Sequence, residues 1–187
     1  NNCRYLDGFT IQNNNSENGQ ATLYSTDHVT YKNLILQNNE GSPINRQSSN
    51  LQIFDTIIRN NNINGNGGAL TINGNSSVLI DNVQLLNNTV TAEGGAIAIN
   101  SNAIVTINNS LITGNHSDDK GGAILVRSGS NPATIEINNS TIAYNTSDGS
   151  DGHGVGDIFD YHPGSESHSN FIINNSIIWD DNILVTS

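Results

Sequence analysis

Acidic and histidine residues gather in one stretch of the chain, residues 146–168, where they could hold a metal ion or a sugar. The stretch contains Asp148, Asp151, Asp157, Asp160, Glu166, His153, His162 and His168. Spaced carboxylates among glycines can surround Ca²⁺, and mixed Asp and His side chains suit Zn²⁺ or similar ions. The run Asp-Gly-Ser-Asp-Gly lacks the full calcium-loop pattern, so a solvated insertion loop without a ligand is the competing interpretation.

The candidate metal ligands are Asp148, Asp151 and Asp157, with calcium as the expected ion. Aromatic residues near the stretch could offer flat surfaces to sugar rings. Long insertions on repeat proteins often carry the binding function. The sequence therefore predicts a ligand site formed by Tyr144, Asp151, His153, Asp157, Asp160, Tyr161, His162 and Trp179.

Two pairs of adjacent acids outside the stretch are candidates for glycoside hydrolysis, which needs carboxylates on both sides of one groove. They are Asp118-Asp119 and Asp180-Asp181. The first pair is expected in a solvated turn, with Lys120 stacked on Glu93 as a surface ion pair that contributes little. Asp181 falls on a position of the repeat described next. No catalytic residue is assigned.

A repeat organises the whole chain. The unit V-x-I-x-N-S-x-I-x-x-N occurs in seven copies, at spacings of 25, 22, 27, 27, 30 and 36 residues. Apolar residues at every second place predict short strands rather than helices. A strand repeat of this length cannot bury its own apolar face, so the copies must stack. The prediction is an all-β, right-handed parallel β-helix of about seven coils, one domain over residues 1–187 that is a segment of a longer solenoid.

Two polar columns, six residues apart, recur in the repeat. The first contains Asn33, Asp55, Asn82, Asn109, Asn139 and Asn175, and the second contains Asn39, Asn61, Asn88, Asn115 and Asn145. We expect both columns to point inward at bends between strands. An inward amide can donate to the same side chain one coil away, which satisfies polar groups that are costly to bury. The asparagines are therefore predicted to be structural.

Three copies carry a glycine turn, Gly67-Gly68-Ala69, Gly94-Gly95-Ala96 and Gly121-Gly122-Ala123. Glycine permits the sharp turn into the following strand. Six positions beside these turns are expected to face outward, namely Ala69, Ala96, Ala123, Thr71, Ala98 and Leu125. Such a flat strip could accept a protein or a polymer, or be an ordinary exposed strand face.

Four segments resemble secreted bacterial right-handed β-helix repeat proteins of the pectate-lyase-like superfamily. They are Leu6-Asp7-Gly8-Phe9-Thr10-Ile11, the repeated Gly-Gly-Ala-Ile, the Ile-Asn-Asn-Ser-x-Ile-x-x-Asn unit and Asn175-Ser176-Ile177-Ile178-Trp179. The Gly-Gly-Ala element is also similar to repeats of polymorphic outer-membrane proteins. The resemblance implies a secreted or cell-surface setting in bacteria. It leaves the activity open, because such proteins include lyases, hydrolases and adhesins.

A lyase site would need outward acids on adjacent coils with an Arg or Lys base nearby. The outward columns read Asp7, Lys32, Phe54, Asp81, Asn108, Asn138, Asn174 and Tyr5, Thr30, Gln52, Leu79, Thr106, Glu136, Ile172. No two acids adjoin in either column. The lyase site is therefore not expected on this sheet.

The net charge of −11 disfavours nucleic acid and anionic membranes as partners, and no apolar run is long enough for membrane insertion. The leading hypothesis is an exported, cell-surface structural or adhesive domain that binds carbohydrate or a partner protein. End-to-end contacts through uncapped coils are also expected. A polysaccharide lyase or glycoside hydrolase is the alternative.

Overall fold

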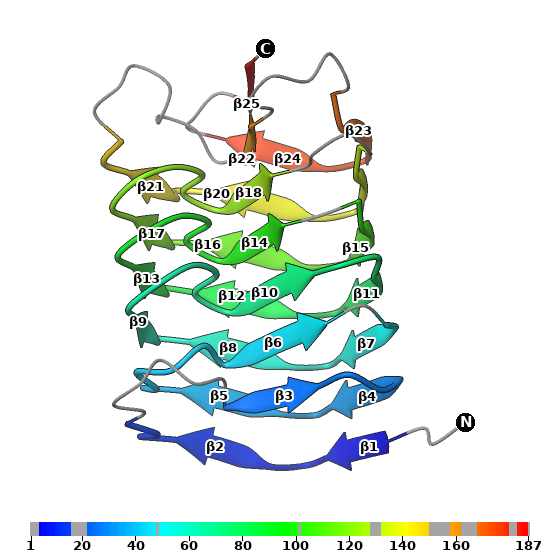
Figure 1. Ribbon diagram of the computed structural model, residues 1–187, viewed down its shortest axis with the longest axis vertical. Coiled ribbons are helices and arrows are strands. Elements are labelled where there is room, and N and C mark those ends of the chain that lie inside the picture. The colour runs from blue at the N-terminus through cyan, green and yellow to red at the C-terminus, as the bar shows by residue number, and fades with distance from the viewer. Residues whose placement is uncertain are drawn as a thin grey trace.

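The computed structural model describes residues 4–15, 22–47, 49–100, 102–127, 132–149, 158–161, 168–179 and the backbone of 183–186. These residues form 25 strands in three seven-stranded sheets and one four-stranded sheet. The coils rise from the blue N-terminal coil to the red C-terminal strand (Figure 1). Within the described residues, no helix could span a membrane. The predicted right-handed parallel β-helix is confirmed.

The strands fall into sheets that we name A to D. Sheet A contains β1 (Arg4–Asp7), β4 (Val29–Lys32), β7 (Leu51–Phe54), β11 (Ser77–Asp81), β15 (Ile104–Asn108), β19 (Thr134–Asn138) and β23 (Asn170–Asn174). Sheet B contains β2 (Thr10–Gln12), β5 (Ile35–Gln37), β8 (Ile57–Arg59), β12 (Gln84–Leu86), β16 (Leu111–Thr113), β20 (Thr141–Ala143) and β24 (Ile177–Trp179).

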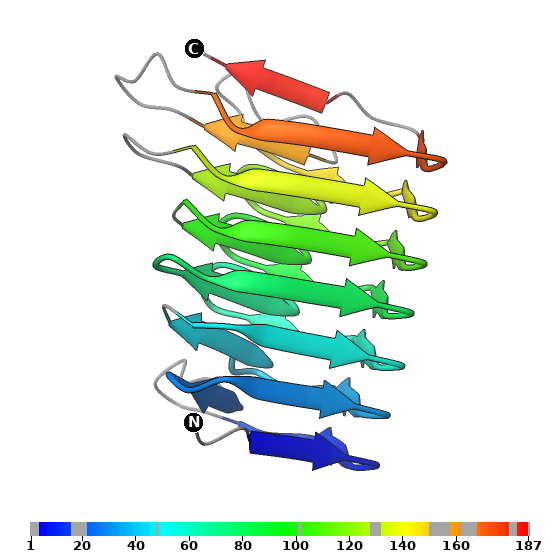
Figure 2. The same ribbon diagram turned by 90° about the vertical axis from the view of Figure 1, so that its right-hand side faces the viewer.

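Sheet C contains β3 (Leu23–Ser25), β6 (Ile44–Gln47), β10 (Leu70–Asn73), β14 (Ile97–Asn100), β18 (Ile124–Arg127), β22 (Ile158–Tyr161) and β25 (Ile183–Thr186). Sheet D contains β9 (Asn62–Ile63), β13 (Thr89–Val90), β17 (His116–Ser117) and β21 (Thr146–Ser147). A complete coil passes from sheet A through B and D to C. Figure 2 shows the strands of sheet A stacked in chain order.

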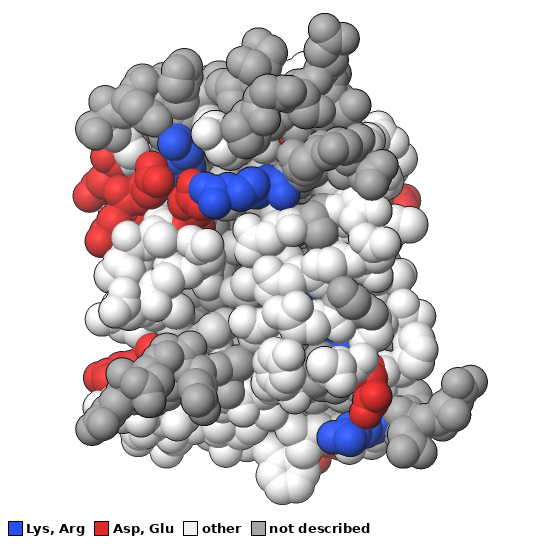
Figure 3. Space-filling view, viewed as in Figure 1, with Lys and Arg blue, Asp and Glu red and all other residues white. Residues whose placement is uncertain are grey.

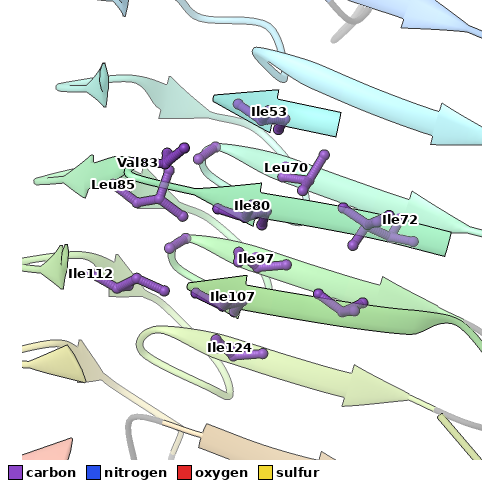
Figure 4. Close-up of a cluster of buried hydrophobic side chains, with 14 of the residues drawn as sticks. Ile53, Leu70, Ile72, Ile80, Val83, Leu85, Ile97, Ile107, Ile112 and Ile124 are labelled. Atoms are coloured by element: carbon purple, nitrogen blue, oxygen red, sulfur yellow. The ribbon is translucent and has the colours of Figure 1, made fainter. Parts of the chain in front are cut away.

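The register matches the alignment of the repeat copies. Val78 pairs with Val105, and Asp81 pairs with Asn108, all in parallel. Alternate residues point into the space between the sheets, where they form the core (Figure 4). The core side chains on successive coils include Ile53, Ile80, Ile107, Leu85, Ile112, Leu70, Ile97 and Ile124, all at most 2% exposed. Burying one such side chain contributes about 1.5–3 kcal/mol.

The second asparagine column is an internal ladder, as predicted. Asn39, Asn61, Asn88, Asn115 and Asn145 are at most 1% exposed. From Asn39 to Asn115, each Nδ2 donates to Oδ1 of the next member at 2.8–2.9 Å. The same Oδ1 atoms also accept from main-chain N atoms one coil below. The ladder therefore satisfies side-chain and main-chain groups that the bend would leave unpaired.

The first asparagine column is not internal, and this prediction is wrong. Asn33, Asn82, Asn109, Asn139 and Asn175 are exposed and have φ between 47° and 56°. One left-handed residue makes the bend between sheets A and B and turns its side chain outward. There the amides of Asn33 and Asn82 donate to the carboxylates of Asp7 and Asp55 at 2.7 and 2.8 Å.

Hydroxyl side chains form a second internal ladder that the sequence reasoning missed. Oγ of Ser110, Ser140 and Ser176 accepts from the main-chain N one coil below, at 3.1 Å in each case. Each hydroxyl donates to the carbonyl two residues earlier, at 2.6–2.8 Å. Thr56 occupies the same column. The signal was the Ser that follows the first Asn in the repeat unit.

The strip of small residues beside the glycine turns is covered, contrary to the prediction. Ala69, Ala96, Ala123, Ala98 and Leu125 are 0% exposed, and Thr71 is 7% exposed. Oγ1 of Thr71 donates to the carbonyl of Asn66 at 2.9 Å, so the turn that enters sheet C lies over its outer face. A flat docking strip at these positions is therefore excluded.

Candidate ligand-binding surfaces

The structure separates the described members of the predicted ligand site. Tyr144 and Trp179 lie at sheet B, Tyr161 lies on the outer face of sheet C, and Asp160 lies inside the coil stack. Asp151, His153, Asp157 and His162 lie outside the described residues, as do Asp180 and Asp181. Two parts of the predicted insertion, residues 146–147 and 158–161, continue sheets D and C in register.

Asp160 faces the core rather than the surface. It is 0% exposed and pairs in register with Val126, an inward residue of the coil below. Its Oδ2 accepts from the main-chain N of Ser169 at 3.0 Å, shortly before β23. The contact ties the return of the chain to the top of sheet C. Asp160 is a structural residue here and does not share a face with Tyr144 or Trp179.

Charged and aromatic side chains meet on sheet C around Tyr161. The Tyr161 ring stacks on Phe159 with a centroid distance of 6.2 Å. Lys120 Nζ and Arg127 Cζ lie 5.2 and 5.5 Å from its centroid. Figure 3 shows blue and red side chains gathered over the upper coils of this face. Because the cations already rest against the ring, Tyr161 is part of a packed surface cluster.

Arg127 also forms the main ion pair of that cluster. Its Nη2 lies 2.5 Å from the carboxylate of Glu93, whose side chain is only 6% exposed. The predicted pair of Lys120 with Glu93 is replaced by this contact, and Lys120 lies 3.8 Å from Asp119 instead. The reason is that residue 127 lies at the end of a sheet C strand, over which the turn carrying Glu93 folds. Both carboxylate oxygens of Glu93 accept from Arg127 Nη2, so the pair is a charge-assisted hydrogen bond.

His116, on sheet D, lies close to the carboxylates of two aspartates. Its Nδ1 lies 2.8 Å from Oγ1 of Thr146, the residue directly above it. Its Nε2 lies 3.4 Å from Asp118 and 3.7 Å from Asp148. Within the described residues, no group of three or more His, Cys, Asp or Glu side chains is arranged to hold a metal ion. Asp148, one of the predicted calcium ligands, is thus found beside His116. Calcium binding stays a prediction.

Tyr144 and Trp179 form an exposed aromatic surface at the C-terminal end of sheet B. Trp179 pairs in register with Ala143, so Tyr144 lies one residue further along and one coil below. The side chains of Tyr144 and Trp179 are 63% and 61% exposed, and neighbouring Ile177 is 57% exposed. Two predicted sugar-stacking residues thus lie at neighbouring positions on adjacent coils, while Tyr161 lies on another sheet.

The structure also has a groove on sheet A that the sequence reasoning missed. It has a volume of about 420 Å³ and is lined mainly by His28, Thr30, Asn50, Gln52, Ser77 and Leu79. Oγ1 of Thr30 donates to Oε1 of Gln52 at 3.2 Å across adjacent coils. Three of the lining residues, Thr30, Gln52 and Leu79, belong to an outward column that the sequence predicts. The hollow also depends on the turns next to these strands, which the column does not include. Its lining combines hydroxyl and amide groups with the His28 imidazole and apolar side chains such as Leu79.

The register of sheet A confirms the outward columns that argue against a lyase site. Asp81 lies between Phe54 and Asn108, and Glu136 lies between Thr106 and Ile172. Adjacent carboxylates are therefore not found in the described columns of this sheet. Comparison of the chain with family models, curated proteins and solved structures finds no match.

Proposed function

We propose that the chain is an exported, cell-surface structural domain that binds carbohydrate on its outer faces without cleaving it. The observation that carries the proposal is the division of the polar side chains between the inside of the coils and the outer faces of the sheets. The internal Asn and Ser columns join one coil to the next, as in the bond from Asn88 to Asn115. The residues left on the outside of sheets A and B include many amides, hydroxyls and aromatics, together with aliphatic side chains and a few charged groups. Such groups bind sugars by hydrogen bonding and stacking.

The setting in this proposal rests on the resemblance to secreted bacterial β-helix proteins. A polar chain with a net charge of −11 is soluble and repels polyanions, which argues against an acidic polysaccharide as ligand. Rods built of stacked coils present long, rigid surfaces to extended partners. These properties fit a domain that holds or contacts a neutral glycan at the cell surface.

The test is a retention assay on insoluble polysaccharides, neutral and acidic, with the heat-unfolded protein as control. We expect the folded protein to be retained by at least one neutral polysaccharide, with no new reducing or unsaturated ends in the supernatant. New ends that increase with protein concentration would make the chain a hydrolase or lyase. Failure of every polysaccharide to retain it, with capture by a protein partner instead, would also overturn the proposal.

A further inference from the structure

We infer that Tyr144, Trp179 and the amide column below them bind a neutral, linear polysaccharide that runs parallel to the axis of the β-helix. The inference rests on the proposed function and gives it a site, a ligand class and an orientation. The site lies on the outer face of sheet B and on the bend that follows it.

The backbone at Tyr144 supplies the first argument. Tyr144 occupies the bend before the internal ladder, where each copy that the structure describes has a positive φ, and its own φ is 57°. The equivalent residues are Asn13, Asn38, Asn60, Asn87 and Gly114. Asn and Gly accept this conformation readily, whereas a bulky side chain there is strained. Among the described residues, Tyr144 is the one aromatic with a positive φ.

Strain of this kind persists where the side chain has a use, because Asn or Gly would fold more stably at the same position. The ring of Tyr144 contributes little to packing, since 63% of the residue is exposed. Trp179 lies on the next coil, where it pairs with Ala143, the residue before Tyr144, and it is 61% exposed. We call this pair of exposed aromatic residues the platform, because their side chains can present apolar surface to a ligand with an apolar face.

The charge of the surface selects the class of ligand. The outward residues around the platform on sheet B are Leu111, Thr113, Thr141 and Ile177, none of which is charged. Arg59, the charged outward residue of the described sheet B strands, lies on a coil well below, where its Nε donates to Gln37. A sugar presents C–H groups to aromatic rings and hydroxyls to amides. A neutral polysaccharide therefore fits better than an acidic one.

The amide column gives the orientation. Asn38, Asn60 and Asn87 follow one another below Tyr144, one on each coil, and all three are exposed. Adjacent coils are about 4.8 Å apart, which is close to the length of one sugar unit in an extended chain. Gly114 has no side chain, and a Cβ there would lie 2.2 Å from Oδ1 of Asn87. The Asn87 amide thus fills the step directly below Tyr144, and the column continues without a gap.

Tryptophan fluorescence tests the site directly, because Trp179 is the only tryptophan of the chain. The probes are soluble hexamers of β-1,4-linked glucose, mannose and xylose, with a hexamer of galacturonic acid as the charged comparison. We expect a saturable change of emission with at least one neutral hexamer and at least tenfold weaker binding of the acidic one. Equal binding of the acidic hexamer would overturn the assignment to neutral sugars.

The decisive variant is Tyr144→Asn, which restores the residue type of the column. We expect at least tenfold weaker binding together with a higher midpoint of unfolding in urea. Trp179→Ala should abolish binding, measured by calorimetry. Tyr24→Ala, at an exposed tyrosine on sheet C, is the matched control and should bind like the wild type.

Two outcomes would overturn the site. In the first, polysaccharide retains the protein, but the Trp179 emission does not change on binding and Tyr144→Asn binds as tightly as the wild type. The proposed function would then hold, with the binding site on another face of the protein. In the second, sedimentation shows a dimer of the wild type that Trp179→Ala dissolves, which assigns the aromatic surface to a second copy of the chain. If no polysaccharide retains the protein, the proposed function fails with the site.

Discussion

Asn88 donates its Nδ2 hydrogen to Oδ1 of Asn115, one coil above, at 2.9 Å. The same Oδ1 accepts from the main-chain N of Asn88 at 3.0 Å. Nδ2 of Asn88 also donates to the carbonyl of Ile58 on the coil below, at 3.1 Å. One side chain therefore joins three consecutive coils, and its neighbours in the ladder do the same.

Asn88→Ala should destabilise the protein strongly. The change removes the acceptor for both the side-chain and the main-chain donor of Asn61 and leaves them buried. Each unpaired buried group costs about 1–3 kcal/mol, so we expect a loss of about 3 kcal/mol or more in the free energy of unfolding. Urea unfolding followed by circular dichroism measures it. Gln84→Ala, at an exposed position of sheet B, should stay within about 0.5 kcal/mol of the wild type.

Ser140→Ala should cost about 1–2 kcal/mol of unfolding free energy. Oγ of Ser140 accepts from the main-chain N of Ser110 at 3.1 Å, and alanine leaves this buried N–H unpaired. Ser140→Thr keeps the hydroxyl, and Thr56 shows that the column accommodates threonine. The threonine variant should therefore lose less than half as much in the same urea titration. Equal losses for both variants would mean that packing, and not the hydroxyl, determines the residue.

Gly95→Ala should disrupt the stacking of the glycine turns. A Cβ at Gly95 would lie 2.0 Å from the carbonyl O of Gly122 on the next coil, a backbone atom that cannot move alone. Overpacking of this kind costs about 3 kcal/mol or more. Gly65→Ala is the comparison, because a Cβ there meets nothing within 4 Å and only the φ of 144° opposes it. It should cost about 1–2 kcal/mol, measured by the same unfolding experiment.

Stability at alkaline pH should depend on Tyr31. Burial raises the pKa of the Tyr31 hydroxyl above its ordinary value, so folding favours the neutral form. The resulting stability is complete below the ordinary tyrosine pKa of about 10 and is lost as pH rises through the folded pKa. Tyr31→Phe should therefore gain stability relative to the wild type between about pH 9 and pH 11. An unfolding midpoint difference that stays constant across this range would contradict the argument.

The core columns could be predicted from the sequence because their alternation is strict and their spacing to the Asn residues is constant. The outward turn of Asn33 could not, since Asn suits both an inward amide ladder and a left-handed bend. The two positions differ only in backbone conformation. The residue type alone therefore predicts an inward side chain at both positions, which is right for Asn39 and wrong for Asn33.

Burial of the small residues on sheet C could not be predicted either. Side chains alternate between the two faces of a strand, which places Thr71, Ala98 and Leu125 outward, and they do point away from the core. What buries them is the turn that folds back over the sheet, a tertiary contact without a periodic signal. The candidate site shows the same limit, because Tyr144 and Trp179 were identified as residue types. Their adjacency on neighbouring coils depends on the register, and the strain at Tyr144 depends on φ.

The chain length of a bound glycan tests the central claim most directly. A defined neutral oligosaccharide that binds the protein is incubated with excess protein, and its length distribution is followed by mass spectrometry over several days. Binding without cleavage predicts that every chain keeps its original length while the complex persists. Shorter chains or unsaturated ends that appear at a rate proportional to protein concentration would contradict it.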